Sequence, residues 1–137
     1  MVLVDTNMLV DVLERAPQWF DWSIGQVRRL AMTHSLAINP VIYAELAATC
    51  SSSAMLDEKI ATMSLIFEQI PRNVAFLAGK AYVIYRRQGG TRSNVLSDFL
   101  IGAHAAVLGC PLLTRGTRRY RTYFPNVRLI APVPDLC

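Results

Sequence analysis

Three carboxylic acids stand alone in apolar stretches of this chain, where a charged side chain needs a specific reason to be. Asp5 interrupts the apolar run that opens the sequence, and Glu45 lies within the run "YAELAA". Asp98 is the only charged residue of its own apolar stretch if His104 is neutral. A buried carboxylate is costly unless a cation or hydrogen bonds compensate its charge. If the three acids converge, they indicate a site for Mg²⁺, which takes oxygen ligands.

Other roles are open for each acid taken singly. Asp5 or the pair Ser97 and Asp98 can cap a helix, whereas Glu45 is expected inside a helix and has no capping role. For one acid alone the structural role is the stronger interpretation, and only the set of three favours a cation. A Ser/His/Asp hydrolase is disfavoured because neither histidine accompanies a serine in a nucleophile-elbow context.

Arginines are concentrated in the stretch "PLLTRGTRRYRTYF" (111–124). No acid lies among them, and aromatic residues are interleaved with them. This combination suits single-stranded RNA, whose bases stack on aromatic rings while its phosphates pair with guanidinium groups. The alternative is a solvated face whose aromatics belong to the core. The candidate RNA-binding residues are Arg115, Arg118, Arg119 and Arg121.

The charge balance also favours a polyanionic partner. Fourteen basic residues against ten acids give a net charge of +4. Only Lys59 and Lys80 among the basic residues are lysines. The planar guanidinium of arginine suits bidentate contacts with phosphate, so an arginine-rich excess indicates a nucleic acid more than a generic anion.

Length and composition exclude several classes of protein. The 137 residues are 53% hydrophobic, which is enough for a folded core, and we expect one domain over 1–137. No apolar run is long enough for a membrane span, and an acid in the first apolar run disfavours a signal peptide. Cys50, Cys110 and Cys137 fit neither a disulfide framework nor a zinc site, so we expect the reducing cytoplasm.

The elements that must position these residues alternate along the chain. Apolar runs predict strands at 2–5, 35–38, 66–70, 111–114 and 127–130. Helices are predicted between them, at 6–14, 17–32, 41–50, 54–65, 73–88 and 97–109. Such alternation calls for a parallel sheet covered on both faces, hence a three-layer α/β/α domain with four to five strands. The crevice beyond the carboxyl ends of the strands is the expected binding site, and the three acids fall there.

Three stretches, taken in order, resemble the PIN-domain family and in particular the VapC-type toxins of bacterial toxin–antitoxin pairs. They are "LVDTNMLVDVL", "NPVIYAELA" and "LSDFLIGAHAAVLGCPLLTR" followed by "YRTYFP". The resemblance covers essentially the whole chain and implies a small α/β/α ribonuclease whose acids bind Mg²⁺ or Mn²⁺. Carried over by position, it makes Asp5, Glu45 and Asp98 catalytic metal ligands. Asn7 and Thr114 complete the first and last motifs.

One position departs from the family pattern. Members of the family normally carry an acid two residues after Thr114, where this chain has Gly116. Either the cluster is naturally incomplete or the acid was lost by substitution in a harmful chain. A simpler local interpretation is that Gly116 supplies a positive φ in a turn. The departure bears on catalytic competence and leaves the expected fold unchanged.

The resemblance implies a metal-dependent endoribonuclease that acts as a toxin and is held in check by an antitoxin. Metal held by the carboxylates would lower the pKa of a bound water and offset charge on the phosphate. The same resemblance implies a homodimer. It also implies that the early helices, which include Trp19 and Trp22, receive the antitoxin, although core packing explains these residues as well. The alternative, which Gly116 favours, is a PIN-like module that binds RNA or antitoxin without cleaving.

Overall fold

The computed structural model describes residues 1–133 and is built around a five-stranded sheet in which every pairing is parallel. The strand order is β3-β2-β1-β4-β5. The five predicted strands are all present, each shorter than expected. Their bounds are β1 Val2–Val4, β2 Leu36–Ile38, β3 Ile66–Phe67, β4 Leu112–Leu113 and β5 Leu129–Ile130.

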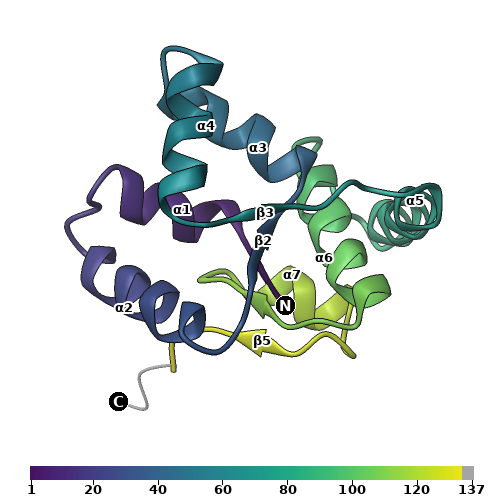
Figure 1. The fold of residues 1–137 in the computed structure, drawn as a ribbon. Coiled ribbons are helices and arrows are strands. Elements are labelled where there is room, and N and C mark those ends of the chain that lie inside the picture. The colour runs from purple at the N-terminus through teal and green to yellow at the C-terminus, as the bar shows by residue number, and fades with distance from the viewer. Residues whose placement is uncertain (134–137) are drawn as a thin grey trace.

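Helices connect the strands and cover both faces of the sheet, which confirms the α/β/α prediction (Figure 1). Right-handed crossovers place the helices before β3 on one face and those after β3 on the other. The first group is α1 Thr6–Leu13, α2 Phe20–Ala31, α3 Pro40–Leu46, the 3₁₀ turn Ala47–Thr49 and α4 Ser53–Thr62. The second group is α5 Arg72–Arg87, α6 Leu96–Leu108 and α7 Arg118–Tyr123.

The core lies between the sheet and these helices. Every residue of β1, β2 and β4 is buried, as expected for central strands with helices on both sides. Phe99 of α6 is fully buried and contacts Tyr82 and Tyr85 of α5 with ring centroids 6.0 and 5.6 Å away. Because the central strands are buried and paired, the residues that follow them are held in fixed positions at the carboxyl edge of the sheet.

Local chemistry explains where several helices begin and end. Asp5 caps α1 by accepting a hydrogen bond from the Thr6 amide, which confirms one of the two roles expected for this acid. Asn39 caps α3, and its amide group also contacts buried His104 at 3.1 Å, which makes that histidine a core residue. Ser97 and Asp98 do not cap α6. That helix begins at Leu96 without a side-chain cap, so the capping interpretation of the pair is wrong.

Helix α7 was not expected from the sequence. No helix is predicted between the strands at 111–114 and 127–130, but Tyr120 and Phe124 recur four residues apart and bury one face of the segment. They pack on Gly102 of α6, where a Cβ atom would lie 2.4 Å from the Phe124 ring. A glycine on α6 therefore lets α7 approach closely.

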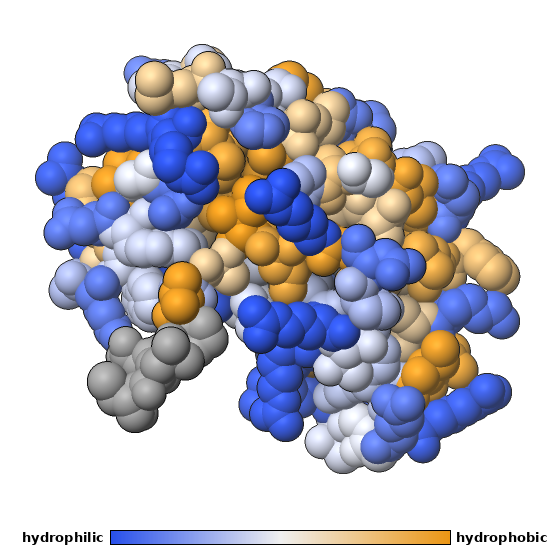
Figure 2. Space-filling model, turned by 90° about the horizontal axis from the view of Figure 1, so that it is seen from below, coloured by the Kyte–Doolittle hydropathy of each residue, from blue (hydrophilic) through white to orange (hydrophobic). Residues whose placement is uncertain are grey.

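The outer surface is mixed in character. Long hydrophilic side chains project around a central apolar area on the face below β5 (Figure 2). Cys50 and Cys110 are free thiols, and Cys137 lies outside the described residues. Within residues 1–133, none of the helices combines the length and the apolar character needed to span a membrane.

Candidate active site

Asp5 lies at the carboxyl end of the central strand β1, where its carboxylate is almost completely buried. One oxygen, Oδ1, accepts the Thr6 amide at 2.8 Å. The other, Oδ2, accepts the hydroxyl groups of Thr114 at 2.8 Å and Tyr120 at 2.9 Å. Parallel pairing of β1 with β4 brings Thr114 to this position, and α7 brings Tyr120. Three separate elements thus hold one carboxylate in a fixed orientation.

The surroundings of the Asp5 carboxylate disfavour its ionised form. The pKa of Asp5 is raised from 3.8 to about 6, chiefly by burial and to a smaller extent by the neighbouring Asp98 carboxylate, although hydrogen bonds from the Thr114 and Tyr120 hydroxyls oppose the change. Burial likewise raises the pKa of Tyr120 well above its ordinary value, with added contributions from Asp5 and Asp98. Tyr120 therefore acts as a hydrogen-bond donor to Asp5. A cation placed between the two carboxylates would relieve this repulsion.

Asp5 and Asp98 line the same open cavity, whose volume is about 560 Å³. Asn7 and Gly116 also border it, together with Arg118 and Arg119 of α7. Asp98 reaches the cavity from the first turn of α6 and is ion-paired with Arg119 of α7. The cavity thus brings two predicted acids together with part of the predicted arginine cluster.

Glu45 occupies a different position from the other two acids. It lies on α3, is exposed, and is not part of the cavity wall that the described residues form. The Thr6 hydroxyl donates to Glu45 Oε1 at 2.6 Å, and the amide of the same residue donates to Asp5. Thr6 therefore connects the third acid to the first. Within residues 1–133 no three His, Cys, Asp or Glu side chains are grouped closely enough to hold one metal ion.

The loop after β4 is held in place by Asn7 and Thr114. Asn7 accepts the Arg115 amide at 3.2 Å, and the Thr114 hydroxyl accepts the Gly116 amide at 3.1 Å. Gly116 does not adopt the left-handed conformation, so the interpretation that it supplies a positive φ is wrong. A Cβ atom at this position would meet only the Asn7 amide nitrogen, at 3.7 Å. The loop therefore has room for a side chain at position 116, which borders the cavity.

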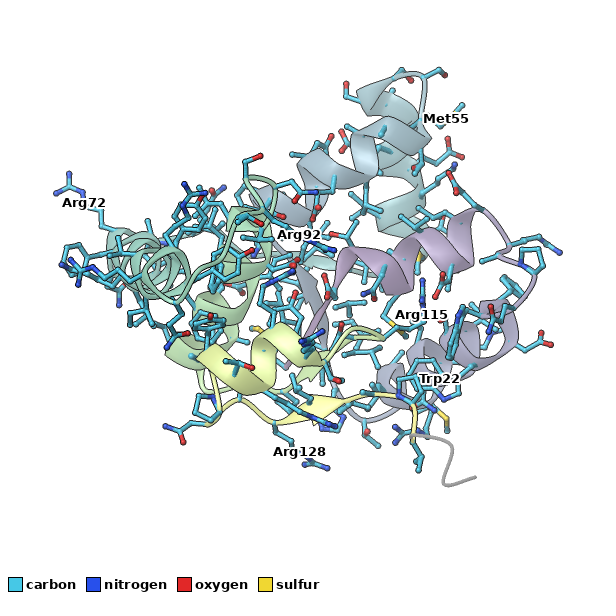
Figure 3. All side chains as sticks on the ribbon, turned by 180° about the vertical axis from the view of Figure 1, so that it is seen from behind. Trp22, Met55, Arg72, Arg92, Arg115 and Arg128 are labelled. Atoms are coloured by element: carbon cyan, nitrogen blue, oxygen red, sulfur yellow. The ribbon has the colours of Figure 1, made fainter. Side chains whose placement is uncertain are left out.

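The four candidate RNA-binding arginines separate into different environments. Arg118 and Arg119 line the cavity, whereas Arg121 is exposed outside the cavity wall formed by residues 1–133. Arg115 turns away and pairs with buried Asp11 at 2.5 and 3.0 Å. Figure 3 shows Arg115 between α1 and α2 near Trp22, while Arg92 lies toward α6. The prediction that Arg115 faces RNA disagrees with this geometry, because its guanidinium is used to neutralise an internal acid.

Comparison with known proteins agrees with this arrangement. The family model described as the PIN domain matches residues 2–125. The chain belongs to the PIN-domain family. No match was found among curated proteins.

Solved structures share the fold of this PIN domain along nearly its whole length. VapBC2 from Rickettsia felis bound to a promoter DNA fragment has a TM-score of 0.74 at 21% identity, covering 97% of this chain and 100% of that one. DNA-bound VapBC from Salmonella typhimurium has a TM-score of 0.70 at 19% identity, with 95% and 96% covered. VapC20 from Mycobacterium tuberculosis, described as a sarcin-ricin loop cleaving toxin, has a TM-score of 0.64 at 13% identity, with 93% and 99% covered.

The donor atoms of the PIN-domain site fit a hard divalent cation. Asp5 and Asp98 present carboxylate oxygens to one cavity, and no sulfur or imidazole borders it within the described residues. Mg²⁺ and Mn²⁺ prefer such oxygen ligands. Glu45 joins this set only through Thr6 in the present arrangement. The site therefore offers two carboxylates that face the cavity, Asp5 and Asp98, and a third, Glu45, that is connected to it through the Thr6 hydroxyl.

Sequence reasoning missed two kinds of site residue. Tyr85 of α5 lines the cavity, although it belongs to none of the motifs. Arg92 also lines it, and the sequence does point to this residue, because Arg86, Arg87 and Arg92 form a second, weaker candidate group for RNA contact just before Asp98. Asp11 and Ser23 form the buried support of Arg115, with the Ser23 hydroxyl donating to Asp11 at 2.8 Å. An isolated acid in the apolar run "MLVDVL" was a detectable signal for Asp11, whereas nothing local marked Tyr85.

Proposed function

We propose that this PIN domain is a Mg²⁺- or Mn²⁺-dependent endoribonuclease that acts as the toxin of a toxin–antitoxin pair. The observation that carries the proposal is the shared cavity, where Asp5 and Asp98 lie beside Arg118 and Arg119. Carboxylates that attract a metal next to guanidinium groups that attract phosphate are the two parts needed for metal-assisted cleavage of a phosphodiester.

Each residue has a defined part in this proposal. Asp5 and Asp98 hold the metal, and Glu45 supports it from the α3 side through Thr6. Thr114 and Tyr120 keep Asp5 oriented, and the burial that raises the Asp5 pKa makes a cation at this position especially favourable. A bound divalent ion supplies a more acidic water and neutralises charge on the phosphate. Asn7 and Thr114 fix the loop that borders the reacting region.

The relatives supply the biological context of the proposal. One similar structure is described as a toxin–antitoxin complex from Klebsiella pneumoniae, and VapC20 is described as a sarcin-ricin loop cleaving toxin. From these relatives we infer that this chain has an antitoxin partner and forms a homodimer. Helix α5 supports the homodimer, because Phe76, Val83 and Ile84 are exposed on it at 69%, 42% and 48%. Light scattering of the purified chain measures this state directly.

An RNA cleavage assay tests the enzymatic proposal. Structured and single-stranded RNAs are incubated with the chain in Mg²⁺ or Mn²⁺ and in excess chelator. We expect cleavage only with metal, and loss of cleavage in Asp98→Asn. Asp21→Asn, which changes an exposed acid of α2, is the matched control. Equal cleavage by wild type and Asp98→Asn would exclude the proposed site.

A second candidate function is an RNA- or antitoxin-binding module without catalysis. It is favoured by Gly116, which leaves the family's usual acid position without a carboxylate, and by the Arg119 ion pair that occupies Asp98. The same assay separates the two, because the binding module retains RNA affinity and shows no metal-dependent cleavage.

A further inference from the structure

One side of the cavity carries aromatic rings that the cleavage chemistry does not use. Tyr85 from α5 and Tyr123 from α7 lie next to each other in its lining, which also includes Arg92 and Arg118. The interleaved aromatics of the arginine-rich stretch were expected to meet RNA, but Tyr120 and Phe124 are buried at 3% and 6% exposure. Tyr123, the remaining aromatic residue of that stretch, is half-exposed. The other ring that lines this side of the cavity is Tyr85, which comes from α5.

Tyr85 is held rigidly at the cavity wall. Its hydroxyl accepts the Arg92 amide at 3.1 Å, which ties the loop after α5 to the ring. Gly90 packs directly on the same ring, where any Cβ atom would lie 2.4 Å from ring carbons. Phe99 supports the ring from the core, with centroids 5.6 Å apart. The ring is therefore fixed in place before any ligand arrives.

Tyr123 is fixed by comparable contacts. Its hydroxyl donates to the Gln88 side chain at 3.0 Å, and its ring meets Phe99 edge-on with centroids 5.1 Å apart. The Tyr85 and Tyr123 rings are 6.1 Å apart and nearly perpendicular, at 78°. Both side chains are only half-buried. Two rigid and accessible rings thus form one corner of the cavity.

Free positive charge flanks this corner. Arg92 and Arg118 are exposed, and neither forms an ion pair with any acid in the part of the chain that the structure describes. Arg115 and Arg119, in contrast, are already paired with Asp11 and Asp98. The two unpaired guanidinium groups are therefore available to an anionic ligand that also offers an aromatic surface.

We propose that Tyr85 and Tyr123 form a subsite for one unpaired nucleobase of RNA, with Arg92 and Arg118 at the adjoining phosphates. The inference rests on the proposed function and specifies its substrate as RNA that is single-stranded next to the acids. Bases in a duplex are stacked on one another and cannot reach such a corner, whereas unpaired bases stack on protein rings. A cavity of about 560 Å³ accommodates a single nucleotide.

Binding measured without cleavage tests the subsite. Fluorescence anisotropy follows a labelled single-stranded RNA of about eight nucleotides, a length within the usual range for such grooves, in excess chelator. Each base is replaced in turn by an abasic nucleotide. At one position, removal of the base weakens binding to the wild-type chain by about tenfold, as expected for loss of one stacked base. The same removal changes binding to Tyr123→Leu less than twofold.

Matched variants separate stacking from structural effects. Tyr123→Phe keeps the ring and loses only the bond to Gln88, so it restores sensitivity to base removal. Tyr43→Leu removes a half-buried tyrosine of α3 outside the cavity wall and behaves as wild type. Tyr123→Leu keeps the wild-type salt dependence, because the arginines are unchanged, and a melting curve verifies its fold.

The outcomes distinguish the subsite from the broader proposal. Equal sensitivity of wild type and Tyr123→Leu to base removal at every position overturns the subsite and leaves the nuclease proposal standing. Equal affinity for a duplex of the same sequence also overturns the subsite, because a duplex exposes no unpaired base. A wild-type chain that binds none of the RNAs overturns both proposals.

Discussion

The guanidinium of Arg119 is ion-paired with the carboxylate of Asp98, so one of the two acids of the cavity already has a cation supplied by the chain. The pair joins the first turn of α6 to α7 and is about one-third exposed on the Asp98 side. A metal ion that binds Asp98 must compete with this guanidinium. Once displaced, Arg119 is free to meet a phosphate in the same cavity.

Removing this competitor should strengthen metal binding. We expect Arg119→Gln to bind Mn²⁺ about fivefold more tightly, which corresponds to roughly 1 kcal/mol for a partly exposed ion pair. Isothermal titration calorimetry without RNA measures the affinity. Arg121→Gln, an exposed arginine of the same helix, is the control and should leave it unchanged. If Arg119→Gln binds Mn²⁺ no better than wild type, the ion pair does not compete with metal.

Placing an acid at position 116 should strengthen both metal binding and cleavage. The loop accepts a side chain there, since a Cβ atom makes only an ordinary contact with Asn7. We expect Gly116→Asp to cleave RNA about tenfold faster or more, which requires about 1.4 kcal/mol of transition-state stabilisation. Gly116→Asn has similar volume without charge and is the control. Unchanged metal affinity and cleavage in Gly116→Asp would show that position 116 does not belong to the site.

The buried carboxylate of Asp5 should make stability depend on pH. Its pKa is raised from 3.8 to about 6, so between these values the folded chain holds a proton that the unfolded chain releases. The free energy of unfolding therefore falls as pH rises through this window, by up to about 3 kcal/mol. In chelator, Asp5→Asn should gain stability relative to wild type from pH 4 to pH 8. Chemical denaturation at both values measures it, and a constant difference would contradict the raised pKa.

Arg118 and Arg115 should affect RNA binding differently. Arg118 is exposed at the cavity, so Arg118→Gln should weaken RNA binding and reduce the logarithmic salt slope by about 0.7 for one lost phosphate contact. Arg115→Lys keeps a charge beside Asp11 and should leave the slope unchanged. A reduced salt slope in Arg115→Lys would show that Arg115 contacts an RNA phosphate after all.

The buried pair of Arg115 and Asp11 should matter for stability. Asp11 is 2% exposed, and Arg115→Gln leaves its charge without a partner, so we expect a loss of about 3 kcal/mol in the free energy of unfolding. Asp11→Asn combined with Arg115→Gln should recover part of this loss. Arg115 also lies over the Trp19 ring at 5.1 Å, so tryptophan fluorescence reports whether the pair is intact. No recovery in the double variant would mean that the two residues do not act as a pair.

The sequence by itself determined the fold and the location of Asp5 at the carboxyl edge of the sheet. Apolar runs such as "VLV" and "LAI" are local signals, and their alternation with helices is enough to specify a parallel sheet with two covered faces. Asp5 comes directly after its strand, so its place at the sheet edge needed no knowledge of distant residues. The strands are shorter than the apolar runs that predicted them, because the ends of a strand are set by its pairing with neighbouring strands.

Only the tertiary structure decided which partner each charged or aromatic side chain meets. Arg115 and Arg118 look equivalent in "TRGTRR", yet one neutralises Asp11 from the loop after β4 and the other faces the cavity as the first residue of α7. Tyr85 enters the site through packing of α5 on α6, which no local pattern encodes. Propensity and periodicity act over a few residues, whereas burial, ion pairing and pKa depend on groups that folding brings together from far along the chain.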